Sequence, residues 1–542
     1  MDEYETVDGN LTDCNVGARK KRNIRDNLFV VNGVINAVIE KDANPVDIEL
    51  FDISKCFDSL WLKECLNDLY EAGIDNSNLN LIYEGNKECF LSVKTPTGQT
   101  KRIVINETVM QGSVWGPLCC TTTMDKIGQK AYKTGSALYM YKGMVSIPPL
   151  GMVDDELTIA ECGANATITN AIMNSFTESK KLKFGIKKCN KMHIGEDTLV
   201  CEDIRVHDSV GKTVLQDKYV GDVLENNGSN KANIKERLDK GYGIVNEILS
   251  ILSEIPLGPY RMSVGLRLRE AMLLNGIMFN SEIWYNVKEE EEKKLSEVDE
   301  FLLRSILGAP AKTPKEALFL ETGCVPIKYI LKMRRLMYLH HILKRPHDEL
   351  IRKFYEAQKC KPSKGDWAQT VAENIGELNL NLSDAEISQM SKYKFRKLLK
   401  KKVYDSAFTY LMEKKRSHSK MFDTEYRELE IQTFLKSNSG LTNDEKHFLI
   451  KFRLRMASLR KNYPNQYQDL RCQLCLAEDE DQIHLFRCSK ILDRCEALAN
   501  NIDIEFEDIF GSLMKQTQAV RLLMKIWNTR EDLIKEQNDN PA

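Results

Sequence analysis

Hydrophobic and polar positions near the start of the chain follow two different periods. Residues 24–41 repeat apolar side chains at helical spacing, and residues 62–70 do so again before Gly73, a residue type that commonly ends helices. Between these helices, residues 46–53 alternate polar and apolar side chains, which predicts a strand with Asp52 at its end. The mixture of periods indicates an α+β domain.

The same mixture continues to about residue 225. Apolar runs on either side of Asp154 and Asp155 predict a hairpin with the two carboxylates at its tip. A loop with glycines and a proline, residues 111–118, precedes a predicted helix at 118–132. The other elements predicted in this region are β-type runs at 89–93 and 102–105, a helix at 164–179, and strands at 182–186, 191–194, 199–206 and 218–222.

Beyond residue 225 the helical period dominates. Apolar stripes cover residues 234–252 and 295–306. Pro310 and Pro314 mark a boundary before a second helical region that reaches about residue 460. The order of elements therefore predicts an α+β domain followed by mostly helical parts.

Composition sets limits on compartment and partners. The 542 residues, 42% of them hydrophobic, suffice for roughly three to four packed domains. With 77 basic and 79 acidic residues the formal charge is only −2, so local basic patches would have to meet any nucleic acid. The 15 cysteines without an N-terminal apolar signal segment favour a reducing compartment. The chain has no apolar run of about eighteen residues, so no membrane partner is expected.

Three carboxylates are candidates for a metal site: Asp52 and the adjacent pair Asp154 and Asp155. Like charges gathered in apolar surroundings repel each other and lose hydration, so a fold that clusters them normally does so around a divalent cation. Two such cations can clamp the attacking and leaving oxygens of a phosphoryl transfer. Taken alone, however, an Asp-Asp pair is more typical of a solvated turn.

A second candidate metal site lies near the C-terminus. Cys472, Cys475, His484 and Cys488 have the spacing Cys-x2-Cys-x8-His-x3-Cys, which offers the ligand number and softness that tetrahedral zinc requires. We predict one structural Zn²⁺ here. Two alternatives remain: Cys495 in place of Cys488 as a ligand, or buried thiols and a surface histidine without metal.

Taken together, the motifs resemble the reverse transcriptase of non-LTR retrotransposons. The resemblance covers residues 14 to 225 through five segments in order, and the Cys/His motif extends it to about residue 490. The five segments are Phe51-Asp-Ile-Ser-Lys-Cys-Phe-Asp-Ser, Gln111-Gly-Ser-Val-Trp-Gly-Pro-Leu, Met152-Val-Asp-Asp, Leu182-Lys-Phe-Gly-Ile-Lys-Lys-Cys and Lys218-Tyr-Val-Gly-Asp.

The resemblance implies a polymerase palm, with an antiparallel sheet and helices, followed by helical parts. The implied divisions are partial fingers at 1–45, the palm at 46–225, a helical thumb at 226–312, a helical connector or nucleic-acid-binding region at 313–460, a zinc knuckle at 461–495 and a helical tail at 496–542.

The resemblance also assigns the chemistry. Asp52, Asp154 and Asp155 would bind two Mg²⁺, and a primer 3′ hydroxyl would attack the α-phosphate of a deoxynucleoside triphosphate. Lys188 corresponds to the lysine that protonates the leaving pyrophosphate, with Lys187 as its rival.

Further residues correspond to nucleotide contacts of the family. Phe57 matches the aromatic residue that lies under the sugar and excludes a 2′ hydroxyl, with a plain core position as the alternative. Gln111 and Gly112 match the loop that touches the template and the incoming nucleotide. Arg19 and Arg22 would meet phosphates.

The family has further finger residues before the segment that begins at Asp13, and an endonuclease upstream of them. We therefore expect the chain to be a 5′-truncated copy or a partial gene model.

The function implied is that of an RNA-directed DNA polymerase that copies RNA from a nicked DNA 3′ end. Its partners would be an RNA template, a DNA primer or target and deoxynucleotides, and its location would be nuclear by family analogy. The alternative is a nucleic-acid-binding protein that keeps the fold and the zinc knuckle without polymerising. Two stretches rich in basic and aromatic residues, 328–338 and 392–402, would either neutralise phosphates or form solvated helix faces.

Overall fold

A five-stranded sheet with the order β13-β10-β1-β9-β8 lies at the centre of the N-terminal half. Its middle strand, β1 (Val46–Asp52), pairs antiparallel with β10 (Asn190–Ile194) on one side and β9 (Asp155–Glu161) on the other. β8 (Leu150–Met152) pairs antiparallel with β9, and β13 (Lys212–Thr213) runs parallel to β10. The predicted α+β class is confirmed.

The computed structural model of the chain describes residues 7–106, 108–109, 112–135, 138–161, 164–196, 204–206, 209–255, 260–421, 424–495 and 513–539.

The central strand faces two hydrophobic cores. Ile48 and Leu50 point into the core that contains α2 (Ile24–Ile39), whereas Phe51 belongs to the core on the other face. Because neighbouring residues of a strand point to opposite faces, a shift of one residue would exchange the two sets. Burial on both faces therefore fixes the register of β1, and with it the position of Asp52. The second core includes α6 (Gly116–Thr134) and α7 (Ala164–Lys180), together with helices of the segment after β1.

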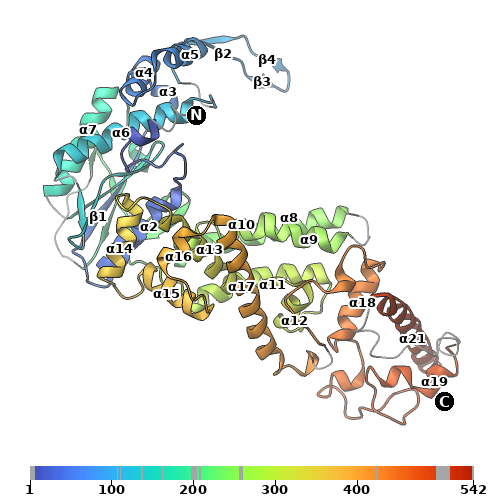
Figure 1. The fold of residues 1–542 in the computed structure, drawn as a ribbon. Coiled ribbons are helices and arrows are strands. Elements are labelled where there is room, and N and C mark those ends of the chain that lie inside the picture. The colour runs from blue at the N-terminus through green and yellow to red at the C-terminus, as the bar shows by residue number, and fades with distance from the viewer. Residues whose placement is uncertain are drawn as a thin grey trace.

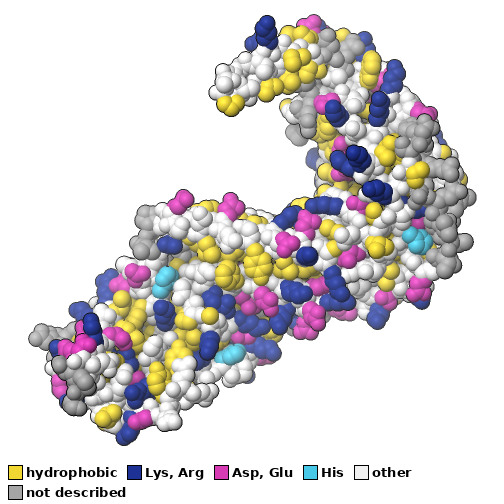
Figure 2. All heavy atoms as spheres, turned by 180° about the vertical axis from the view of Figure 1, so that it is seen from behind, with side chains coloured by type: hydrophobic (Ala, Val, Ile, Leu, Met, Phe, Trp, Pro, Cys, Tyr) yellow, Lys and Arg dark blue, Asp and Glu magenta, His cyan; other side chains and the backbone are white. Residues whose placement is uncertain are grey.

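Three helices and two hairpins after β1 build an arm at the top of the molecule (Figure 1). Seen from behind, the surface is hollowed between this arm and the helices that follow the sheet (Figure 2). The elements of the arm are α3 (Cys56–Ser59), α4 (Leu62–Glu71), α5 (Asn76–Asn86), β2 (Glu88–Leu91) paired with β5 (Ile103–Asn106), and β3 (Lys94–Thr95) paired with β4 (Gly98–Gln99).

The rest of the chain is mostly helical, as the sequence predicts. Among the described residues no helix is both long and apolar enough to cross a bilayer. The remaining strands are β6 (Tyr139–Tyr141), β7 (Val145–Ile147), β11 (Arg205–Val206), β12 (Ser209–Val210), β14 (Gln216–Tyr219) and β15 (Asp222–Glu225). The remaining helices are α8 (Lys231–Glu254), α9 (Arg261–Leu268), α10 (Leu274–Ile277), α11 (Glu289–Leu307), α12 (Lys315–Thr322), α13 (Ile327–Leu343), α14 (Leu350–Cys360), α15 (Trp367–Glu377), α16 (Asp384–Gln389), α17 (Lys392–Lys415), α18 (Asn443–Arg453), α19 (Ser489–Leu492) and α21 (Leu513–Asp539).

Helices from the second helical region pack directly against the sheet domain. The Phe29 ring on α2 lies 5.4 Å from that of Phe354 and 5.1 Å from that of Trp367, both edge to face. On the β6–β7 hairpin, the buried Lys142 Nζ donates to the Ser363 hydroxyl at 2.6 Å. The apolar core is therefore continuous from α2 to α15, although about 300 residues separate them in sequence.

Two predicted strands are wrong. Residues 218–222 contain the end of β14, the start of β15 and the turn between them. Of residues 182–186, Phe184 makes a single bridge with Ile53, and a 3₁₀ turn, Ile186–Lys188, follows. The Gly185 amide donates to the Asp52 carbonyl at 2.8 Å, so this segment closes over the end of β1 instead of joining the sheet. The predicted strand at 199–206 lies partly outside the described residues, and its described end contains β11.

Candidate active site and metal centre

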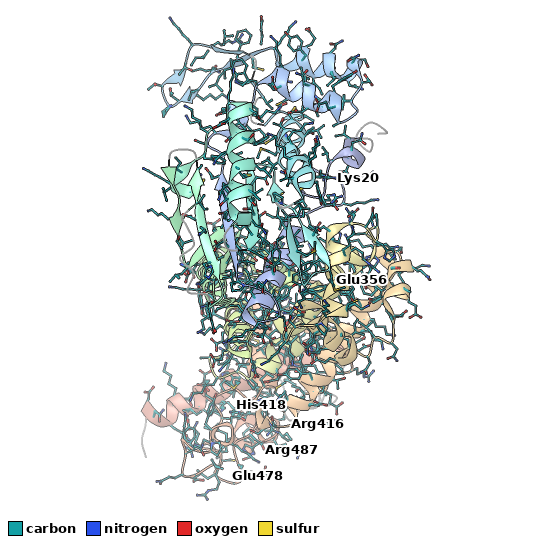
Figure 3. All side chains as sticks on the ribbon, turned by 90° about the vertical axis from the view of Figure 1, so that its left-hand side faces the viewer. Lys20, Glu356, Arg416, His418, Glu478 and Arg487 are labelled. Atoms are coloured by element: carbon teal, nitrogen blue, oxygen red, sulfur yellow. The ribbon has the colours of Figure 1, made fainter. Side chains whose placement is uncertain are left out.

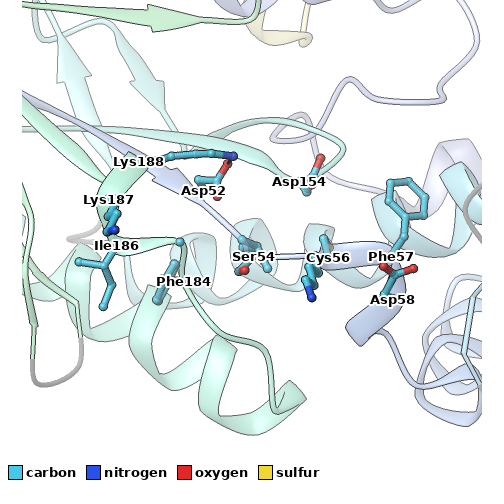
Figure 4. Close-up of a pocket in the computed structure, with 13 residues that line it drawn as sticks. Asp52, Ser54, Cys56, Phe57, Asp58, Asp154, Phe184, Ile186, Lys187 and Lys188 are labelled. Atoms are coloured by element: carbon cyan, nitrogen blue, oxygen red, sulfur yellow. Dashed lines mark hydrogen bonds and ion pairs between the residues drawn. The ribbon is translucent and has the colours of Figure 1, made fainter.

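Strand pairing brings the three predicted carboxylates to one end of the sheet. Asp52 is the register partner of Asp155 in the last pair of β1 and β9, where Cα atoms of antiparallel strands lie about 4.5–5.5 Å apart. Asp154 occupies the turn between β8 and β9, beside Val153, which has φ +64°. Figure 4 shows Asp52 and Asp154 side by side at the rim of one pocket.

That pocket has a volume of about 530 Å³ and opens between α3 and the turn after Phe184. Phe57 is half-buried at one end, and Lys187 and Lys188 lie at the other. An aromatic ring, acidic groups and cations thus share one cavity. Its lining is Asp52, Ile53, Ser54, Lys55, Cys56, Phe57, Asp58, Asp154, Phe184, Gly185, Ile186, Lys187 and Lys188.

The electrostatics of the cluster favour a bound cation. Burial raises the pKa of Asp154 and of Asp155 above the ordinary value, and the charge of Asp52 raises both further. The repulsion is relieved when positive charge sits between the carboxylates. Hard carboxylate oxygens at an open pocket suit Mg²⁺, which binds one or two carboxylates and keeps other positions for substrate oxygens.

Lys188 already places positive charge at this cluster. Its Nζ donates to Asp52 Oδ1 at 2.9 Å, and this hydrogen bond raises the pKa of the lysine. The side chain is 73% exposed, so it can turn toward a ligand in the pocket. Lys187 lines the pocket too, but it makes no such contact with the carboxylates within the described residues.

The predicted nucleotide-contact residues have mixed surroundings. Gln111 lies outside the described residues, and Gly112 is exposed with φ +88°, a conformation that favours glycine. Arg19 is 7% exposed, and its guanidinium donates to Asp8 and to backbone carbonyls of residues 8–15. Arg22 pairs with Asp13 at 2.8 Å and is also largely buried. These contacts favour structural roles for both arginines.

The predicted zinc ligands come together at the other end of the molecule. The ligand atoms of Cys472, Cys475, His484 and Cys488 all lie within 4.8 Å of one another. Tetrahedral zinc with Zn–S bonds near 2.3 Å requires sulfurs roughly 3.8 Å apart. The Cys472 and Cys488 sulfurs are 3.8 Å apart, and Cys475 Sγ is 3.4 Å from His484 Nε2. The four ligands therefore fit one zinc ion without rearrangement.

The hydrogen bond between two thiols of the cluster lowers the pKa of Cys472 and raises that of Cys488. The backbone amides of Leu474 and Cys475 lower the pKa of Cys472 further. His484 Nδ1 lies 3.2 Å from Glu478 Oε2, which leaves Nε2 free to face the sulfurs. Figure 3 shows Glu478 at the end of the molecule opposite the arm and far from Lys20, which lines a pocket together with Met152 of β8.

Comparison with known proteins adds a family to this geometry. Residues 7–224 match the family model described as reverse transcriptase (RNA-dependent DNA polymerase). These residues form a reverse transcriptase domain.

Two similar solved structures are telomerases. Apo telomerase from Candida tropicalis is 10% identical, with 73% of this chain and 59% of that one covered and a TM-score of 0.35. Telomerase from Candida albicans in complex with a TWJ fragment of telomeric RNA is 11% identical, with 57% and 53% covered and a TM-score of 0.30. The chain thus spans about half the length of the telomerase chains that it matches. No curated protein matches it.

Asn15 holds the hairpin that carries Asp154 and Asp155, and the sequence motifs do not include it. Its Oδ1 accepts from the Val153 amide at 3.1 Å, and its Nδ2 donates to the Val153 carbonyl at 2.9 Å and to Glu156 Oε1 at 3.2 Å. A Cβ on Gly151 would lie 2.4 Å from that same Glu156 oxygen. The hairpin therefore needs glycine at 151 to admit these buried polar groups.

A second set of hydrogen bonds joins the hairpin to the β14–β15 turn. The Tyr219 hydroxyl donates to the Leu150 carbonyl at 2.9 Å. Asn27 Nδ2, from α2, donates to the Gly151 carbonyl at 2.9 Å and to the Tyr219 hydroxyl at 3.2 Å. Tyr219 belongs to the Lys218-Tyr-Val-Gly-Asp motif, so this motif contacts the strand that leads into the Met152-Val-Asp-Asp motif.

The last residue of that motif, Asp222, connects the turn to the helices beyond it. Arg237 on α8 donates to Asp222 Oδ1 at 2.6 Å, and both side chains are 3% exposed. Asn280 and the Trp284 indole also donate to this carboxylate, each at 3.2 Å. The chain of contacts therefore runs from α8 through Asp222 and Tyr219 to the strand that precedes the paired aspartates.

Truncating Asp222 tests this connection. We expect Asp222→Ala to lower the free energy of unfolding by about 3–5 kcal/mol, because it leaves the Arg237 charge buried without its partner. The double variant Asp222→Leu with Arg237→Met removes both charges and should recover most of that loss. Urea denaturation followed by fluorescence measures both. Equal instability of the single and double variants would show that the pair does not act as proposed.

The zinc cluster gives a second expected result. Glu478→Gln should weaken zinc binding by roughly 10- to 100-fold, because a carboxylate that orients a ligating histidine contributes about that much. Competition with a chromogenic chelator measures the affinity. Asp479→Asn is the matched control: it removes a charge from the same loop, and Asp479 pairs with Lys461 instead of His484. Purified protein with no bound zinc would exclude the site.

Proposed function

We propose that this chain is the polymerase module of a non-LTR retrotransposon and copies RNA into DNA from a nicked DNA 3′ end. The observation that carries the proposal is the pairing of Asp52 with Asp155 at the end of the sheet, beside a pocket that Asp52 and Asp154 line, in residues that match the reverse transcriptase family. The order of the five sequence motifs supports the retrotransposon type.

In the proposed reaction, the oxygen of a primer 3′ hydroxyl forms a bond to the α-phosphorus of a deoxynucleotide, and the bond to pyrophosphate breaks. Asp52, Asp154 and Asp155 would hold two Mg²⁺, which supply charge neutralisation and alignment of the two oxygens. Lys188 turns from Asp52 toward the pyrophosphate and donates a proton to its oxygen. Lys187, on the same turn, is the second candidate for this proton transfer.

Phe57 would set the choice of sugar. Its ring is half-buried in the pocket wall close to Asp154, where a sugar must pass to bring the α-phosphate to the carboxylates. A flat ring under the sugar leaves no room for a 2′ hydroxyl. Gln111 and Gly112 would contact the template and the incoming base.

The proposed partners follow from this reaction: an RNA template, a DNA primer or target, and deoxynucleoside triphosphates. A structural zinc ion at Cys472, Cys475, His484 and Cys488 would stabilise the C-terminal module. Action on chromosomal DNA would place the protein in the nucleus. The alternative function, a nucleic-acid-binding protein without polymerase activity, is supported by the two arginines, Arg19 and Arg22, that are committed to structural contacts.

Primer extension on an RNA template with Mg²⁺ separates the two functions. We expect Asp154→Asn to lower kcat by about a thousandfold or more, equivalent to about 4 kcal/mol in the barrier, because one ligand of the metals is lost. Glu161→Gln, at the opposite end of β9, is the matched control and should extend normally. No extension by the unmodified protein, despite nucleic-acid binding, would favour the alternative function.

Sugar selection gives an independent readout. Phe57→Ala should reduce the preference for deoxynucleotides over ribonucleotides by roughly 10- to 100-fold, since removing the ring opens space for the 2′ hydroxyl. The measurement is kcat/KM for dNTP and rNTP incorporation on the same primer. Phe57→Tyr keeps the ring and should keep the preference. An unchanged ratio in Phe57→Ala would leave the ring only a packing role.

A further inference from the structure

The N-terminal half of α17 carries cations that the site described above does not use. Residues 392–402 contain seven Lys or Arg residues and no acidic residue. Six of the seven side chains are exposed, and none of the six pairs with a carboxylate in the described part of the chain. We call this surface the basic face of α17. Its cations are Lys392, Lys394, Arg396, Lys397, Lys400 and Lys401.

The other basic stretch of the sequence, residues 328–338, has different surroundings in the structure. It forms most of α13, where Lys332 and Arg335 are buried and Arg334 donates to the Met278 carbonyl. Lys332 also pairs with Glu377. The cations of α13 therefore hold neighbouring helices together, whereas those of α17 face solvent.

The spacing of these cations makes them costly for an isolated helix. Lys392, Arg396 and Lys400 follow each other at four-residue intervals, and Lys397 and Lys401 form a parallel row. Successive members of a row lie roughly 6 Å apart along the axis. Like charges at this spacing destabilise a helix. A polyanion laid along both rows would reverse the sign of this contribution.

Elements packed against α17 add to the positive potential. Lys344, at the end of α13, is exposed. The ring of His340 on α13 stacks on Phe395 of α17, with the ring centroids 5.2 Å apart. The charges of Lys344 and Lys392 both act on His340. The pKa of His340 is lowered first by burial and then by these two charges.

The carboxylates of the neighbouring α16 do not offset these cations. Asp384 pairs with Lys359 at 2.6 Å, and Glu386 accepts from Ser383 at the start of its own helix.

We propose that the basic face of α17 binds the sugar-phosphate backbone of a DNA duplex, at a surface separate from the catalytic pocket. The inference rests on the proposed function, which requires the protein to hold target DNA while its pocket acts on one strand end. Figure 1 shows α17 among the helices below the sheet domain, away from α3 at the pocket. Phosphate contacts of this kind position a protein on DNA without reading its sequence.

A duplex suits this face better than a single strand. Cations on one rigid helix form straight rows, which match the regular backbone of a duplex. Surfaces that bind single strands carry several aromatic rings on which bases stack. On this face Tyr393, 75% exposed, is the one strongly exposed ring among residues 392–402.

The test is the salt dependence of binding to a blunt, fluorescein-labelled DNA duplex of 24 base pairs, measured by anisotropy with the full chain. Lys397→Gln with Lys401→Gln should weaken binding and reduce the slope of log K against log salt by about 2, since each phosphate contact contributes about 1. The matched control is Lys293→Gln with Lys294→Gln. It removes the same charge from an exposed part of α11 that follows four glutamates, where the potential disfavours phosphate.

Each outcome decides the proposal. An unchanged slope, or equal losses in the two double variants, would overturn it. Tighter binding of a single strand of equal length than of the duplex would also overturn it. Tighter binding of a polyglutamate peptide or of anionic vesicles than of the duplex would do the same.

Failure of the proposed function is visible separately. Extension of a short primer and template should keep its kcat in Lys397→Gln with Lys401→Gln. If the unmodified protein does not extend the primer but the variant changes the slope of log K against log salt, the polymerase function is rejected. The DNA-binding surface on α17 is then retained.

Discussion

The register between β1 and β9 is the constraint on which the rest of this structure depends. It places Asp52 opposite Asp155 and so forces like charges together against their mutual repulsion and their loss of hydration. Backbone hydrogen bonds and the burial of β1 on both faces supply the opposing stabilisation. A charge cluster maintained at this cost is useful when a cation completes it, which is why the geometry favours metal-dependent chemistry over a structural role.

The hairpin that carries the aspartate pair is held from three directions. Asn15 binds its turn, Asn27 and Tyr219 bind the strand before it, and Asp222 extends the contacts to Arg237 on α8. Most of these hydrogen bonds are buried. Removing one partner would therefore lower the stability of the fold by more than the bond itself contributes, because the other polar group would stay buried without a partner. The position of α8 relative to the carboxylates is therefore set by specific pairs and not by apolar packing alone.

Sequence reasoning found what is local and missed what is long-range. The strand ending at Asp52 and the hairpin at Asp154 follow from alternation within a few residues, and both are present in the structure. Asn15 lies 138 residues from Val153, and no pattern near either residue signals their contact. Residues 182–186 have strand-like composition, yet the turn at Gly185 directs them over the end of β1. The segment's tertiary position decided its conformation, and propensity did not.

The two basic stretches show why composition alone does not locate an interface. Both mix cations with aromatic residues at helical spacing, and the near-neutral total charge of the chain hides both. In α13 Lys332 and Arg335 are buried, and Lys332 pairs with Glu377. In α17 only the row from Phe395 through Leu399 to Leu411 faces inward, which leaves the cations in solvent. The difference lies in which face the tertiary fold covers, and that face determines whether a charge stabilises the protein or remains available to a partner.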